Sequence, residues 1–188
     1  MLDAAEALLA ERSISGVTTR ALAKKAQVSE GVLYNHFADK SDLLVAALVR
    51  RFSYLVERLN ASVPRPGEGD VRSNLELLAT HLVELHVDAL PLVRKLIGEP
   101  ELLARFAVAI HGPGLPFGGR QIRDPVLTYL EAEQKAGRLG QFDVGAAADL
   151  LLATTAGLAL VSEIAVIDSP SKVHALVETM LGGLKGEQ

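Results

Sequence analysis

Apolar residues recur at helical spacing along almost the whole chain. Four of them mark a first amphipathic helix that stops near residues 13–16: Leu2, Ala5, Leu8 and Leu9. The other long stretches with a helical pattern span about residues 39–59, 71–88, 90–96, 100–110, 124–136, 143–167 and 171–184. Two Pro and two Gly in residues 62–70 indicate a loop between the second and third of these helices. Because no stretch alternates like a strand, the sequence predicts an all-α fold.

Residues 18–40 predict two short helices joined by a tight turn. Thr18 or Thr19 can cap the first helix, the chain turns at residues 27–28, and Ser29 can cap the second. Leu33 and Phe37 commit one side of the second helix to packing, which leaves a polar side free. A helix-turn-helix with a polar second helix among cations is the arrangement that enters a DNA major groove.

The run TTRALAKKAQVSEGVLYNHFADKSDLL resembles the DNA-binding segment of TetR-type transcriptional repressors. The resemblance rests on the Thr-Thr-Arg start, the Leu-Tyr-x-His-Phe block and the amphipathic helix that follows Lys40. It is strong over about the first fifty residues and only architectural beyond them. It implies a three-helix, helix-turn-helix DNA-binding domain at residues 1–46. A helical-bundle domain for effector binding and dimerisation would follow at residues 47–188.

Five residues are candidates for base contacts. Arg20 begins the first helix of the motif and can reach a guanine edge, or stay a solvated or phosphate-bound cation. Glu30 can accept from a cytosine amino group, or pair with a nearby Lys. Asn35 has the geometry for a two-point contact to adenine, and Val32 can meet a thymine methyl group or belong to the core. Gly31 lets the backbone approach the bases closely.

Five further residues match positions that contact the DNA backbone in the family that the sequence resembles. They are Thr18, Thr19, Tyr34, His36 and Lys40. Hydroxyl, imidazole and ammonium donors suit phosphate oxygens. For Thr18, helix capping is an alternative role that is compatible with a contact to DNA.

The segment 143–167 is small or apolar nearly all round, and apolar residues follow at helical spacing to Leu184. A helix that is apolar on every side needs partners on every side. We therefore expect a homodimer through a four-helix interface made by about Asp143–Leu184 of each chain, as the resemblance also implies. The alternative is a helix buried inside a single chain.

By the resemblance, the C-terminal half binds a small-molecule effector. A mostly apolar cavity with a few polar anchors is typical of such sites, and the candidate lining is His81, His86, Phe106 and Tyr129. The alternative is that the apolar faces fill one another completely. The Gly- and Pro-rich segment 111–119 is interpreted as a plain connector rather than a cover over a cavity.

The chain has 188 residues, no cysteine and a net charge of −4. Without cysteine there is no disulfide or thiolate metal site, which fits a reducing compartment. The first 58 residues carry eight Lys and Arg against seven Asp and Glu, so phosphate attraction is modest and specific contacts matter more. The N-terminus lacks the features of a signal peptide, and the most apolar run, residues 150–161, is too short to span a bilayer. We expect a cytoplasmic protein.

Patterns typical of enzymes are missing from the sequence. His81 and His86 are five residues apart, which does not stack them on one helical face, while His111 and His174 are isolated. The expectation is a protein that is not an enzyme and has no cofactor and no metal. The predicted function is a dimeric transcriptional regulator, a repressor released from a palindromic operator by a small-molecule effector. The alternatives are a DNA-binding regulator without an effector and a helical ligand carrier.

Overall fold

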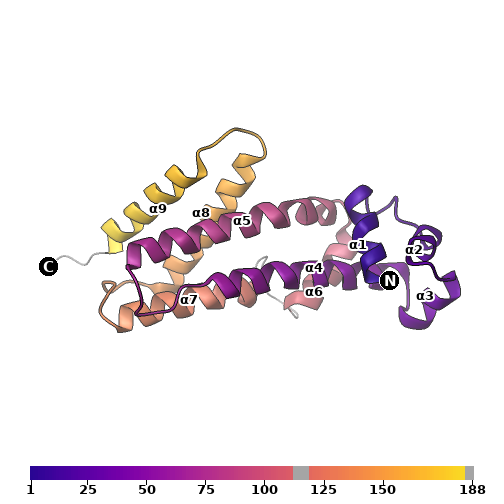
Figure 1. The fold of residues 1–188 in the computed structure, drawn as a ribbon, viewed down its shortest axis with the longest axis horizontal. Coiled ribbons are helices and arrows are strands. Elements are labelled where there is room, and N and C mark those ends of the chain that lie inside the picture. The colour runs from indigo at the N-terminus through magenta and orange to yellow at the C-terminus, as the bar shows by residue number, and fades with distance from the viewer. Residues whose placement is uncertain (112–118, 185–188) are drawn as a thin grey trace. The chain divides into compact units, whose positions relative to one another are not determined.

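The computed structural model describes residues 1–111 and 119–184, and all regular elements in these ranges are helices (Figure 1). They are α1 (Leu2–Glu11), α2 (Thr19–Ala26), α3 (Glu30–His36), α4 (Lys40–Ser62), α5 (Val71–Ile97), α6 (Pro100–His111), α7 (Gly119–Lys135), α8 (Val144–Ser162) and α9 (Ser169–Leu184). The prediction of an all-α fold is confirmed. The predicted connector at 111–119 falls almost wholly on residues 112–118, which lie outside the described residues.

One predicted break in the third long helix is wrong. The sequence pattern predicts a break between residues 88 and 90, but α5 runs unbroken from Val71 to Ile97 with Pro91 inside it. A proline inside a helix removes one backbone N–H donor and crowds the preceding turn. The helix continues because both of its halves are held by packing, as the buried Leu85 and Leu96 show.

Two other helix ends differ from the sequence prediction. Helix α7 begins at Gly119, five residues before the predicted start, and Ile122 in the added turn is buried. Helix α8 ends at Ser162 instead of 167, and a turn with the exposed Ile164 follows it. The apolar residues after 162 continue the hydrophobic pattern, but they are not packed as a helical face would be.

The chain divides into two compact units. The first contains Met1–Tyr54 and the described residues from Pro91 to the end of α6, and the second contains Leu55–Leu90 and the described residues from Gly119 onward. Two of the divisions fall inside a helix, one in α4 and one in α5. The sequence-based boundary between residues 46 and 47 is a division by function, and it stays a prediction.

In the first unit, α1, α2 and α3 gather around the start of α4 (Figure 1). Their shared core consists of leucines that are almost fully buried: Leu8, Leu22, Leu33 and Leu44. Arg50 of α4 also reaches α1, where its guanidinium lies 2.6 Å from an Asp3 carboxylate oxygen and 2.7 Å from a Glu6 oxygen. These ion pairs therefore join α1, which was predicted to pack across the helix-turn-helix, to α4.

In the second unit, α7 packs against α8 and α8 against α9 (Figure 1). The carboxylate of Glu133 is fully buried in this unit, where it accepts the backbone N–H of Gly67 at 3.0 Å and lies 3.2 Å from the Arg138 guanidinium. This buried group ties the α4–α5 loop to the end of α7. Among the described helices, only α8 is long and apolar enough to cross a membrane, a test that core and interface helices also pass.

Candidate nucleic-acid interface

Side-chain capping and a left-handed turn residue set the geometry of α2. Thr18 has extended backbone dihedrals, and its hydroxyl accepts the N–H of Ala21 at 3.1 Å, as predicted. At the other end, Gln27 adopts the left-handed conformation with φ of 56°. The next N–H, that of Val28, then turns back to the carbonyl of Ala23 at 3.0 Å. The chain therefore changes direction directly after α2, and the next helix can begin after a short turn.

Helix α3 begins two residues after this turn. The hydroxyl of Ser29 accepts the N–H of Val32 at 3.3 Å, so the predicted second cap is also confirmed. Leu33 is 4% exposed and anchors one side of the helix. The opposite side presents Glu30 and Asn35 to solvent. Two capped helices joined by a turn of three residues therefore hold a short polar face outward.

The candidates for base contacts lie on or beside this face. Arg20, Glu30, Gly31 and Asn35 are exposed, and Val32 is half-buried between core and surface. The Glu30 carboxylate accepts the hydroxyl proton of Thr19 at 3.1 Å, rather than a lysine ammonium. A Cβ added at Gly31 would meet only the Ser29 hydroxyl oxygen, at 3.8 Å. The backbone of α3 is thus open to close approach at this point.

The candidates for phosphate contacts fall into two groups. Thr18, Tyr34 and His36 are exposed, with Tyr34 at 54%, whereas Thr19 and Lys40 are half-buried. The ammonium of Lys40 donates to the carbonyl of Val17 at 2.9 Å. Lys40 therefore already has a structural partner, which ties the start of α4 to the segment before α2. The ten candidates share one continuous stretch of the first unit, and their contacts with DNA stay a prediction.

Two cations from outside the helix-turn-helix, Arg105 and Lys95, support this region. Arg105 of α6 lies 3.0 Å from a carboxylate oxygen of Asp39 and 3.0 Å from one of Asp42. Asp39 caps α4 by accepting the N–H of Asp42 at 2.8 Å. That backbone hydrogen bond, with help from Arg105, lowers the pKa of the Asp39 carboxyl. No local sequence signal pairs Arg105 with Asp39, because 66 positions separate them.

Lys95, near the end of α5, reaches the last carbonyls of α1. Its ammonium contacts the carbonyl oxygen of Leu9 and lies 3.2 Å from that of Arg12. A cation at a helix C-terminus interacts favourably with the carbonyls that have no partner within the helix. The C-terminal part of α5 and the whole of α6 therefore belong to the same unit as the helix-turn-helix, although they lie far from it in sequence.

The four predicted effector-pocket residues are divided between the two units. Phe106 belongs to the first unit, where its ring meets that of Phe52 edge-to-face with centroids 6.0 Å apart. His81, His86 and Tyr129 belong to the second. His86 donates from Nδ1 to the Leu82 carbonyl at 2.6 Å, and burial lowers its pKa. Burial also raises the pKa of Tyr129 to about 12. A common pocket for all four stays a prediction.

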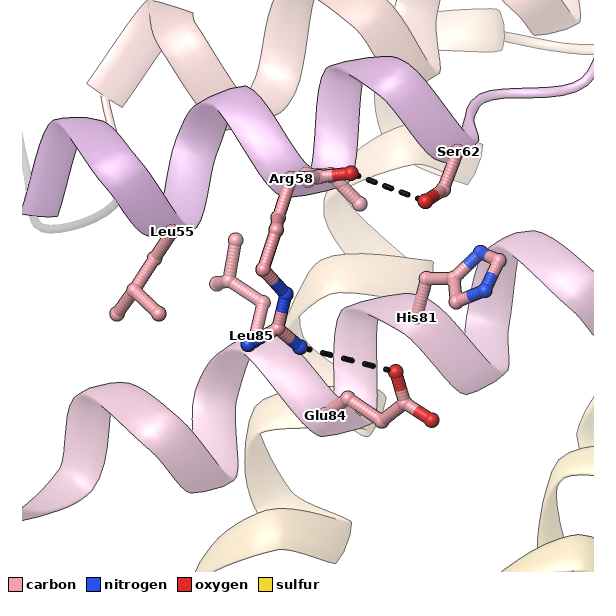
Figure 2. A pocket seen from close by; sticks show the side chains of 7 residues that line it. Leu55, Arg58, Ser62, His81, Glu84 and Leu85 are labelled. Atoms are coloured by element: carbon pink, nitrogen blue, oxygen red, sulfur yellow. Dashed lines mark hydrogen bonds and ion pairs between the residues drawn. The ribbon is translucent and has the colours of Figure 1, made fainter.

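A small pocket does lie between α4 and α5 in the second unit (Figure 2). Its enclosed volume is about 30 Å³, far below the range of roughly 300–1,000 Å³ typical of ligand sites. The Arg58 guanidinium points across it to Glu84 at 4.0 Å, and the Ser62 hydroxyl donates to the Arg58 carbonyl at 2.9 Å. Of the predicted pocket residues, this cavity includes only His81.

A second exposed surface lies on α8 and is apolar, whereas the exposed face of α3 is polar. Helix α8 is apolar nearly all round, and Leu150, Leu160 and Val161 are 55%, 57% and 41% exposed. We call these three residues the α8 outer face. Ile164, in the turn after the helix, is 82% exposed. Large exposed apolar groups that cluster on one element mark a surface that is covered by a partner.

Two capped helices, a left-handed turn residue and an outward polar face define a helix-turn-helix DNA-binding domain in an all-helical protein. The comparisons with known proteins agree with this class. The family model described as bacterial regulatory proteins, tetR family, matches residues 1–47. The matched residues contain the whole helix-turn-helix, so this part of the chain is similar to the tetR family, as the sequence resemblance implied.

One similar curated protein is the HTH-type transcriptional repressor KstR of Rhodococcus jostii, 33% identical over 82 residues. This match spans 44% of the present chain and 37% of KstR. The chain thus matches less than half the length of such relatives. A solved structure of a Rhodococcus sp. RHA1 protein of unknown function is 28% identical, with a TM-score of 0.71 over 97% of this chain and 92% of the other. The FadR regulator of Bacillus subtilis, solved with stearoyl-CoA, has the same fold at 18% identity, a TM-score of 0.65 and coverage of 100% and 97%.

Proposed function

We propose that this chain is a dimeric transcriptional regulator that acts in the cytoplasm, a repressor that binds a palindromic operator and is released by a small-molecule effector. The observation that carries the proposal is the polar, solvent-exposed face of α3. Side-chain caps fix the starts of α2 and α3 within a segment that matches the tetR family model. The side chains of Arg20, Asn35 and His36 form no hydrogen bond or ion pair with another described residue. Their donors and acceptors are available to base edges and phosphates.

The α8 outer face supports the homodimer. A second copy related by a two-fold axis would cover Leu150 and Leu160 with the same residues of its own α8, and α9 of each chain would complete four helices. The helix-turn-helix domains of the two chains would each place α3 in a major groove. The two grooves would be about one DNA turn, or a multiple of it, apart. The dimer therefore explains why the operator would be palindromic.

The effector is supported by the fold and by a neighbour. FadR of Bacillus subtilis was solved with stearoyl-CoA, so a long-chain acyl-CoA is a reasonable first compound to test. For release, the effector must bind the form with low DNA affinity more tightly than the form that is bound to the operator. The small size of the α4–α5 cavity favours a second candidate function, a DNA-binding regulator without an effector.

The decisive experiment measures binding of the full chain to a duplex from upstream of its own gene and to a scrambled duplex, across a salt series. We expect two subunits per site and a preference for the natural duplex that persists at moderate salt. Replacing Asn35 by Ala should relax base preference at one position of each half-site, at a cost of about 1–3 kcal/mol. Asn60→Ala, on an exposed position of α4, is the matched control and should leave binding unchanged.

A failure of both duplexes to bind, at any salt concentration and with every genomic fragment tried, would overturn the regulator. If DNA binds specifically but Asn35→Ala and Asn60→Ala behave alike, the assignment of α3 as the reading helix is wrong. If acyl-CoA and a wider set of small molecules leave operator affinity unchanged, the regulator without an effector is favoured.

A further inference from the structure

One group of side chains outside the α2–α3 region has the composition of a metal site. Glu76 of α5 and His174 and Glu178 of α9 each offer one ligand atom, and these three atoms all lie within 4.8 Å of one another. The Nδ1 atom of His174 is 2.7 Å from an Oε1 atom of Glu76. All three residues belong to the second unit. The sequence leaves His174 isolated, and only the fold brings it beside a carboxylate 98 positions away.

The helical spacing makes this arrangement more than a chance approach of two chains. His174 and Glu178 are four residues apart on α9, so their side chains project from the same face. Glu76 comes from the facing side of α5 and approaches the same point. Two ligands from α9 and a third from α5 can therefore coordinate a single ion.

The ligand set indicates which ions would bind. Imidazole nitrogen and carboxylate oxygen are both ligands of Zn²⁺, which in some sites takes three protein ligands and keeps a water in the fourth position. Tetrahedral ligands at about 2.0–2.2 Å from zinc lie roughly 3.4 Å apart, so the present separations require only small side-chain rotations. Mg²⁺ and Ca²⁺ prefer oxygen ligands alone, and imidazole disfavours them here.

We propose that Glu76, His174 and Glu178 form a binding site for a divalent transition-metal ion, and that this ion is Zn²⁺. In the metal-free chain the charges are already balanced in another way, because Arg72 contacts the Glu178 carboxylate. Arg72 precedes Glu76 by one helical turn on α5. Binding of the ion therefore displaces Arg72 from Glu178 and replaces the contact between His174 and Glu76 with two metal bonds. The bound ion joins α5 to α9.

This competition gives the site a signature that an ordinary surface ion-pair network lacks. Removing Arg72 takes away the competing cation, so Arg72→Ala should bind Zn²⁺ more tightly than the unchanged chain, by about tenfold. Removing a ligand has the opposite effect. His174→Ala and Glu178→Gln should each weaken Zn²⁺ binding on the order of a hundredfold. A network without a metal role predicts no difference in zinc affinity among the three variants.

The test is isothermal titration of the full, chelator-treated chain with Zn²⁺, followed by Co²⁺ as a spectroscopic probe and Mg²⁺ as a hard-ion comparison. We expect one Zn²⁺ per chain, visible absorption from four-coordinate Co²⁺, and no binding of Mg²⁺. His36→Gln, on α3, is the control for histidine content and should bind zinc like the unchanged chain. Circular dichroism of the metal-free variants shows that each is folded before titration.

The proposal is overturned if the unchanged chain does not bind Zn²⁺, or if folded His174→Ala and Glu178→Gln bind it as tightly as the unchanged chain does. Should His174→Ala fail to fold, Glu76→Gln replaces it, and unchanged zinc affinity in that variant likewise overturns the site. None of these results depends on DNA binding, so the site and the regulator are tested separately.

Discussion

The exposed faces of α3 and α8 are both open to solvent, but their chemistry is opposite. On α3 the outward residues are polar, as Glu30 and Asn35 show, and Gly31 leaves the backbone bare. On α8 the outward residues Leu150 and Leu160 are large and apolar. Exposure alone therefore does not identify a partner. The first face suits a ligand with hydrogen-bonding edges and phosphates, and the second suits another apolar protein surface.

The two faces also differ in how they would contribute free energy. Leu150 and Leu160 are already about half-buried, so covering the rest of either side chain is favourable by about 1 kcal/mol and does not depend strongly on orientation. A polar contact from α3 exchanges water for a base edge or a phosphate, and its net gain is of similar size. Such a contact needs correct geometry, which fits the side-chain caps that fix the start of α2 and the start of α3.

The largest expected effect comes from placing a charge on the α8 outer face. Leu160→Glu buries an unpaired carboxylate in the proposed apolar interface, which costs several kcal/mol in the dimer and little in the monomer. We expect the dissociation constant of the dimer to rise by at least about a hundredfold, measured by sedimentation equilibrium, with operator binding lost in parallel.

The matched control for this prediction is Asn60→Glu, which adds the same charge at an exposed position of α4. It should leave the association state unchanged. If Leu160→Glu remains as dimeric as the control, the α8 outer face is not the dimer interface. The assignment of the apolar face to a second copy of the chain would then be wrong.

The next effect tests the bare backbone of α3. Gly31→Ala adds a methyl group that meets nothing closer than 3.8 Å in the free chain, and alanine favours a helix by about 0.5–1 kcal/mol. We expect a chain that unfolds at higher urea concentration but binds its operator about tenfold more weakly, because the methyl group holds the helix away from the bases. A variant that is both more stable and fully active would show that DNA does not approach α3 at Gly31.

Local features were readable from the sequence because their causes are local. Thr18 and Ser29 precede helical patterns and cap those helices, and the periodic apolar residues of α1 and α4 are buried. The prediction failed where packing overrides a local signal. The predicted break between residues 88 and 90 is wrong, because the packing of residues on both sides keeps α5 continuous through Pro91.

The supports of the candidate interface were beyond local reasoning. Lys95 and Arg105 lie in the part of the chain that the sequence assigns to effector binding, but they contact the end of α1 and the start of α4. Only the tertiary fold makes such pairs, because no spacing rule links positions this far apart. The same holds for His174 and Glu76.

A smaller effect is expected from removing one of these supports. Lys95→Met keeps the aliphatic part of the side chain but removes the ammonium from the carbonyls that end α1. We expect a loss of about 1–2 kcal/mol in the free energy of unfolding, measured by urea denaturation. Lys135→Met, at the exposed end of α7, is the control and should lose less. Equal losses would show that the contacts of Lys95 add nothing to stability.

The smallest effect concerns acid sensitivity in the second unit. Burial lowers the pKa of His86 below its ordinary value of 6.5, although the Leu82 carbonyl opposes this by accepting the Nδ1 proton. The unfolded chain therefore takes up a proton at a higher pH than the folded chain. This contribution to stability is fully present above the unfolded pKa and falls as the pH drops below it. His86→Gln should flatten the decline in unfolding free energy between about pH 8 and about pH 5.5, measured by urea denaturation. Because His86 is neutral in both states at the upper pH, the difference between the two chains there isolates the packing effect of the substitution, and parallel profiles would show that His86 is not the group that titrates.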